Sequence, residues 1–166
     1  VLVPATGRFG HGWAGWAGAL GAEPVVLDHG TEAPIDPARV EAALRSDREG
    51  RIRAVLAVHV DTATSVRSDV AAVRAAIDAA GHPALLMADC IASLACDRFE
   101  MDAWGADVTV AASQKGLMGP PGLCFVWFND RAAAARERAH RVTPYWDWRP
   151  RARPEGGFWQ LWGGTA

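Results

Sequence analysis

The sequence predicts an α/β domain in which a mostly parallel sheet carries helices on both faces. The chain of 166 residues has room for one domain, and with 50% hydrophobic and 22% charged residues it can fill a core. Segments with the pattern of strands alternate along it with segments that have the pattern of helices. The strand segments are continuously apolar, which is typical of parallel strands buried on both faces.

The first part of the chain predicts three strands and two helices. The strands are expected at 1–3, 24–27 and 53–58, the last being the run R-A-V-L-A-V. The segment 12–20 places Trp13, Trp16, Ala17 and Leu20 at helical spacing. A second helix is expected to start at Pro37, with Asp36 as its N-cap, and to continue through Leu44.

The second part continues the alternation. A polar loop is expected at 59–66, a helix at 68–80, and strands at 84–88, 107–112 and 123–128. Asn129 is expected to cap a helix that extends to about Arg141. Pro, Trp, Arg and Gly dominate after Val142, so we expect a domain over 1–142 and an irregular arm over 143–166.

Composition excludes several classes of function. The net charge of −2 gives no basic surface for nucleic acid, and no apolar stretch is long enough for a membrane span. Three cysteines are too few for a disulfide framework, which favours a reducing cytoplasm, and no Cys/His spacing predicts a metal site. Because the chain starts with Val1, we expect it to begin inside a longer protein.

Lys115 is the only lysine among 17 basic residues. Arginine can replace lysine wherever charge alone matters, but its guanidinium does not lose a proton and cannot act as a nucleophile. A single retained lysine therefore indicates a position where a free amine is needed.

Candidate reactive groups follow the predicted strands. In open α/β sheets ligands bind beyond the carboxyl ends of the strands, so these groups are expected to converge. They include the carboxylate of Asp89, the amine of Lys115, the Thr62 hydroxyl and the Phe9 ring. An amine, an acid for a ring nitrogen and a flat face for stacking are what pyridoxal 5′-phosphate (PLP) requires.

The same segments resemble a known family. The stretches M-A-D-C-I-A-S-L and W-G-A-D-V-T-V-A-A-S-Q-K-G-L-M-G-P-P-G-L-C-F-V are similar to the class V, fold-type I aminotransferases. The resemblance extends from T-G-R-F-G through H-V-D-T-A-T-S-V to the end of the chain, and favours the alanine–glyoxylate and serine–glyoxylate (serine–pyruvate) branch. It implies the central part of the PLP-binding large domain, incomplete at both ends, in a homodimer that transaminates alanine or serine with glyoxylate or pyruvate.

The resemblance also implies roles for individual residues. Lys115 would form the Schiff base with PLP and move the substrate's α-proton, and Asp89 would pair with the pyridine nitrogen. The remaining cofactor contacts would be stacking on Phe9, packing on Ile91, a hydrogen bond from Thr62 near the ring hydroxyl, and phosphate contacts from Gln114 and from Thr165 toward the partner subunit's site.

Some features depart from the family pattern. Asp61 stands where the family has Glu, and Ser65 stands where it has Gly, which puts the contact of Thr62 in question. The family's N-terminal phosphate-binding turn and its substrate-binding arginine have no counterpart here, and Arg149, Arg151 and Arg153 do not match that arginine.

Three alternatives remain at this point. The first is a cysteine desulfurase-like lyase, although such enzymes carry His where this chain has Gln114. The second is an aminotransferase for an unusual amine such as pyridoxamine. The third is a catalytically incomplete fragment. His59, Cys90 and Cys96 are interpreted as structural residues.

Overall fold

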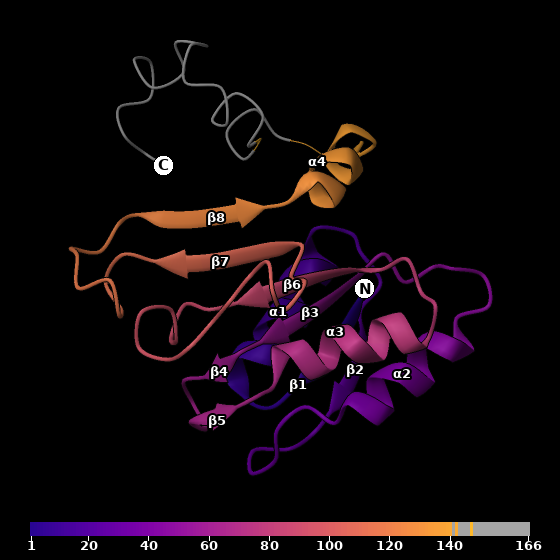
Figure 1. Ribbon diagram of the computed structural model, residues 1–166, viewed down its shortest axis with the longest axis horizontal. Coiled ribbons are helices and arrows are strands. Elements are labelled where there is room, and N and C mark those ends of the chain that lie inside the picture. The colour runs from indigo at the N-terminus through magenta and orange to yellow at the C-terminus, as the bar shows by residue number, and fades with distance from the viewer. Residues whose placement is uncertain (141, 143–146, 148–166) are drawn as a thin grey trace.

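The computed structural model describes residues 1–140, 142 and 147, and confirms the predicted fold class. A six-stranded sheet has the order β2-β1-β3-β6-β7-β8 (Figure 1). Its strands are β1 (Leu2–Ala5), β2 (Val25–Asp28), β3 (Ala54–Val58), β6 (Leu85–Asp89), β7 (Val108–Ala112) and β8 (Cys124–Phe128). The helices are α1 (Arg8–Ala19), α2 (Pro37–Ser46), α3 (Val70–Ala79) and α4 (Asp130–Glu137).

All neighbouring strands in this sheet run parallel except β7 and β8, which pair antiparallel. The carboxyl ends of β3, β6 and β7 therefore lie at the same edge, on the left in Figure 1. Strands β1 and β3 are buried along their whole length, as their continuous apolar runs predict.

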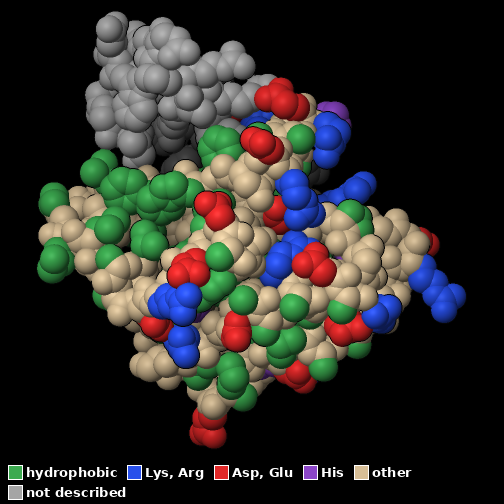
Figure 2. Space-filling view, in the orientation of Figure 1, with side chains coloured by type: hydrophobic (Ala, Val, Ile, Leu, Met, Phe, Trp, Pro, Cys, Tyr) green, Lys and Arg blue, Asp and Glu red, His purple; other side chains and the backbone are tan. Residues whose placement is uncertain are grey.

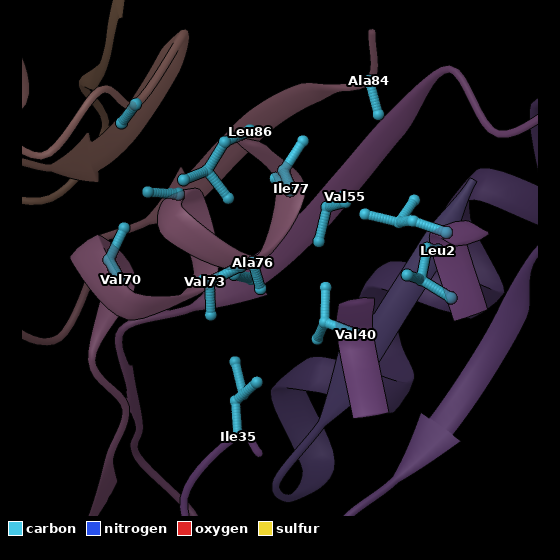
Figure 3. Packing of buried hydrophobic residues seen from close by; sticks show 14 of the residues in the cluster. Leu2, Ile35, Val40, Val55, Val70, Val73, Ala76, Ile77, Ala84 and Leu86 are labelled. Atoms are coloured by element: carbon cyan, nitrogen blue, oxygen red, sulfur yellow. The ribbon is translucent and has the colours of Figure 1, made fainter. Parts of the chain in front are cut away.

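Helices cover both faces of the sheet. On one face α2 and α3 pack through Val40, Val73 and Ile77 onto Val55 and Leu86 (Figure 3). On the other face Trp13 and Ala14 of α1 pack with a smaller cluster that contains Val3, Ala54 and Leu56. The two-sided burial explains why these strands lack the alternation of a half-exposed sheet.

Some helix ends, but not all, are predicted correctly from the neighbouring residues alone. Asp36 and Asn129 cap α2 and α4 as predicted, by accepting backbone N–H bonds from Ala38 and Ala132. Helix α4 ends at Glu137, before the expected Arg141. Helix α1 begins at Arg8, four residues before the expected Gly12.

The prediction of a polar loop at 59–66 is wrong in part. It contains a short antiparallel hairpin formed by β4 (Val60–Asp61) and β5 (Val66–Arg67). Each strand has two residues, which is too short to produce a hydrophobic pattern in the sequence.

Apolar side chains gather over β8 and the loop that connects β7 to β8, in the green area of Figure 2. The large exposed ones are Leu117, Met118, Leu123, Val126 and Trp127. Within the described residues, no helix has both the length and the apolar character of a membrane span, and no cluster of His, Cys, Asp or Glu has the makeup of a metal site.

Candidate active site

Asp89 is the last residue of β6 and is nearly buried, with 7% of its surface exposed. Its Oδ1 accepts the backbone N–H of Ile91 at 2.9 Å, and its Oδ2 accepts the indole N–H of Trp13 at 2.8 Å. Side chains alternate along a strand, so Asp89 shares the α1 face with Met87, which packs on the α1 cluster. The carboxylate is therefore held between the end of β6 and helix α1.

Lys115 and Gln114 lie exposed in a turn that follows β7. Ser113 closes this turn, because its Oγ donates to the carbonyl of Pro120 at 2.5 Å and its backbone N–H donates to the carbonyl of Leu123 at 3.1 Å. In the adjacent strands Asp89 is in register with Val110. The turn that carries the amine thus begins at the sheet edge beside the strand that ends in the carboxylate.

Gly116 allows the turn that carries Lys115 to pack closely against another segment. A Cβ atom at this position would overlap the carbonyl oxygen of Leu94 and would lie 2.7 Å from Sγ of Cys96. Leu94 and Cys96 belong to the segment that directly follows Asp89 and Ile91. The turn after β7 therefore packs tightly against the segment after β6, and the two candidate catalytic residues come from adjoining parts of one edge.

Asp61 connects the start of α1, which carries Phe9, to the loop that carries Thr62. The fully buried Asp61 accepts the backbone N–H groups of Phe9 at 2.9 Å and Gly10 at 3.1 Å through Oδ2. Its Oδ1 accepts the N–H of Ala63 at 3.0 Å. The Phe9 side chain is 45% exposed and Thr62 is exposed, so both are available to a ligand.

Ser65 adopts φ 61°, the left-handed conformation that a glycine takes at low cost. Its N–H donates to the carbonyl of Asp61 at 2.8 Å. The loop thus keeps the backbone geometry of a glycine-containing turn although it carries serine. The departure from the family pattern at this position does not displace Asp61 from the start of α1.

The backbone N–H of His59 donates to the carbonyl of Asp89 at 3.0 Å, but the His59 side chain lies on the other face of the sheet. Its ring contacts Phe99 and Trp104, and its Nδ1 is 2.9 Å from Oγ of Ser93. Burial lowers the pKa of His59, and its packing places it on the side of the sheet opposite Asp89. Burial also raises the pKa of the Cys90 thiol to about 12, so both residues fit the structural role predicted for them.

The structure places the candidate residues at four strand ends, with Phe9 after β1, Thr62 after β4, Asp89 and Ile91 at the end of β6, and Gln114 and Lys115 after β7. Asp61 connects the backbone of Phe9 to the loop that carries Thr62. Three groups that join these segments are not predicted by the sequence motifs: the Asp61 carboxylate, the Trp13 indole and the small Gly116. The spacing of Phe9 and Trp13, four residues apart, places both on one face of a helix and is a signal that could have identified Trp13.

Thr165 and the three arginines of the arm lie outside the described residues. Asp147 is the one residue of 143–166 that the structure describes. Its carboxylate forms an ion pair of 2.6 Å with Arg136 of α4.

Comparison with known proteins identifies the family of this fold and site. The family model described as "Aminotransferase class-V" matches residues 12–142. The chain is 41% identical over 165 residues to a serine–glyoxylate aminotransferase of Methylorubrum extorquens, covering 95% of this chain and 41% of that protein. It is 43% identical over 154 residues to an L-aspartate–glyoxylate aminotransferase of Paracoccus denitrificans, covering 92% and 38% of the two chains.

A solved structure agrees with these relatives. The crystal structure of an alanine–glyoxylate aminotransferase from Nostoc sp. superimposes with a TM-score of 0.81 at 25% identity, covering 95% of this chain and 40% of that one. The chain thus spans about two fifths of the length of the relatives it matches. With most of its residues matched by the family model, the chain belongs to the class V aminotransferases, a family of enzymes.

Proposed function

We propose that the protein is a PLP-dependent aminotransferase that moves the amino group of a small amino acid, alanine or serine, to a 2-oxo acid, glyoxylate or pyruvate. The observation that carries the proposal is the position of the Lys115 turn against the segment that follows Asp89. The named relatives share glyoxylate in their names and differ in the amino donor, which supports glyoxylate as the acceptor more strongly than any one donor.

The residues present fit PLP by their chemistry. Lys115 offers an exposed primary amine, Asp89 a nearly buried carboxylate, and Phe9 a partly exposed aromatic ring. When bound, PLP supplies an electron sink that stabilises negative charge at the substrate's α-carbon. The N-terminal end of α1 is filled by Asp61, so we place the phosphate contacts at Gln114 and at Thr165 of a partner subunit instead.

Each residue then has a defined task. Lys115 would hold the cofactor through Nζ, and the same amine, once released by the incoming amino acid, would take up and return the proton of the substrate's α-carbon. Asp89 would keep the ring nitrogen protonated. Phe9 and Ile91 would pack on the ring, and Thr62 would donate a hydrogen bond near the ring hydroxyl. The amino acid leaves as its 2-oxo acid, and the acceptor 2-oxo acid leaves as an amino acid, so the amino group is conserved.

We further propose that the complete protein is a cytoplasmic homodimer. Thr165, in the segment W-G-G-T, resembles a residue that reaches the neighbouring subunit's phosphate site in this family.

The test is a transaminase assay of the complete protein with alanine, serine and aspartate as donors and glyoxylate and pyruvate as acceptors. We expect the 2-oxo acid of the donor and the amino acid of the acceptor to form in equal amounts. Lys115→Arg should abolish this turnover although it keeps the charge, because guanidinium stays protonated. Substantial turnover in Lys115→Arg would contradict the proposal.

A further inference from the structure

The indole of Trp13 reaches a carboxylate that is 76 residues away in the sequence. Its Nε1 donates a hydrogen bond of 2.8 Å to Oδ2 of Asp89. The second oxygen, Oδ1, accepts the backbone N–H of Ile91 at 2.9 Å. Because each oxygen has its own donor, the plane of the carboxylate is fixed with respect to both the end of β6 and helix α1.

The surroundings strengthen this contact. Trp13 and Asp89 line a small pocket together with Leu56, Met87 and Val110. These neighbours are apolar, so water competes little for the carboxylate, and a hydrogen bond to a charged group in such an environment is stronger than one in water.

We propose that Trp13 is a positioning residue, whose indole N–H orients Asp89 for its contact with the ring nitrogen of PLP. The inference rests on the proposed function and adds to it a residue that acts through Asp89. Phe9 and Trp13 lie one turn apart on α1, so one helix supplies both the stacking ring and the anchor of the carboxylate. Asp61 holds the start of that helix.

Trp16 provides a matched control. It lies on the same helix, three residues after Trp13, and 72% of its surface is exposed. Replacing either indole by phenyl removes the N–H together with the pyrrole ring that carries it. Trp13→Phe removes the hydrogen bond to Asp89, whereas Trp16→Phe tests the effect of losing a tryptophan from α1.

The first measurement uses the complete protein without cofactor. In a ¹⁵N-correlated NMR spectrum, Trp13→Phe identifies the indole N–H signal of Trp13 by its disappearance. We expect this signal to lie downfield, and to move upfield in Asp89→Asn, where the acceptor is a neutral amide. An indole signal that does not change in Asp89→Asn would overturn the proposal. Where Trp13→Phe does not fold, the indole signals of wild type, Trp16→Phe and Asp89→Asn are compared. An indole signal other than that of Trp16 should then move upfield in Asp89→Asn, and no such change would overturn the proposal.

The second measurement uses PLP. A hydrogen bond to a charged group typically contributes a factor of about ten or more to an equilibrium, so we expect Trp13→Phe to weaken PLP binding about tenfold. The ¹⁵N chemical shift of labelled PLP should show less protonation of the ring nitrogen. Trp16→Phe should change neither value.

A double-mutant cycle separates positioning from simple packing. If Trp13 acts through Asp89, adding Trp13→Phe to Asp89→Asn should weaken PLP binding no further. Additive losses would show that the indole only packs, and would overturn the proposal. Failure of the proposed function looks different: the wild-type protein would then not form a borohydride-reducible bond between PLP and Lys115, and the positioning role would fall with it.

Discussion

Asp61 accepts the backbone N–H of Phe9 at 2.9 Å across 52 residues of chain, and this contact defines where α1 begins. The helix has no side-chain cap of its own at Gly7, so a buried carboxylate from β4 takes the place of a local N-cap. Asp61 also accepts the backbone N–H of Ala63, the residue after Thr62. It thereby connects the backbone segments that carry Phe9 and Thr62, two candidate cofactor-binding residues.

Replacing Asp61 by alanine should destabilise the protein by at least about 2 kcal/mol. The substitution leaves the N–H groups of Phe9, Gly10 and Ala63 without this acceptor, and an unsatisfied buried donor typically costs about 1–3 kcal/mol. Urea unfolding measures the loss. Asp36→Ala is the control, because it removes an exposed cap and should cost only about 1 kcal/mol. Equal losses in the two variants would contradict the role of Asp61.

The contact between Asp61 and α1 also explains which parts of the fold the sequence predicts. The run R-A-V-L-A-V has the continuous apolar pattern of a buried strand, and Asp36 with Pro37 marks a helix start locally, so both features follow from a few adjacent residues. The start of α1 does not, because its cap comes from Asp61 and its first turns contain glycines, which have low helix propensity. The antiparallel direction of β8 depends on the pairing of whole strands, which a single segment cannot reveal.

In the candidate site, too, the sequence predicts some residues, whereas other contacts depend on the tertiary fold. A unique lysine and the motif around it predict Lys115 and Asp89 as site residues without any structure. The hydrogen bond between Trp13 and Asp89 depends on the packing of α1 against β6, which is set by the tertiary fold. Thr165 lies outside the described residues, so its role remains a prediction.

A methyl group at Gly116 should displace the Lys115 turn. It would overlap the carbonyl of Leu94 and approach Sγ of Cys96 to 2.7 Å, so the turn has to move away from the segment after Asp89. A displacement of about 1 Å in a catalytic group can reduce its efficiency by up to about a hundredfold, and we expect at least about tenfold slower formation of the Lys115–PLP bond in Gly116→Ala. The rate is measured from the change in absorbance as PLP binds.

Gly15→Ala is the matched control for this substitution. Gly15 lies within α1 and has no atom within 4 Å of an added Cβ, and alanine favours a helix by about 1 kcal/mol over glycine. This variant should be slightly more stable and should bind PLP at the wild-type rate. If Gly116→Ala behaves in the same way, the packing at Gly116 does not position Lys115.

The stability of the protein should decrease below about pH 6.5, in part because of His59. Burial lowers the pKa of His59 from its usual value of 6.5. The unfolded chain therefore takes up a proton at a higher pH than the folded protein, and the free energy of unfolding falls as the pH decreases from about 6.5 toward the lowered pKa. Urea unfolding between pH 7.5 and 5 measures this slope.

His59→Gln should flatten that slope, whereas His140→Gln, which changes an exposed histidine, should leave it unchanged. An identical slope in wild type and His59→Gln would show that His59 does not contribute to the acid sensitivity. The absolute stability of His59→Gln is not the readout, since the ring also packs on Phe99 and Trp104.

Cys90 should resist alkylation in the folded protein. Burial raises the pKa of its thiol to about 12, so at pH 8 only about one molecule in ten thousand carries the reactive thiolate. Cys96 is exposed and should react first. Peptide mapping after brief treatment with iodoacetamide, with and without urea, checks this order. Alkylation of Cys90 as fast as that of Cys96 without urea would show that its environment is open to solvent.

The central claim is that Lys115 is the covalent attachment point of PLP, beside a carboxylate on the adjoining strand. The most direct measurement is borohydride reduction of the complete protein loaded with PLP, followed by proteolysis and mass spectrometry. The account predicts one pyridoxyl group, on the peptide S-Q-K-G-L-M, and none in Lys115→Arg. A protein that binds PLP without labelling of Lys115, or that labels equally in Lys115→Arg, would contradict it.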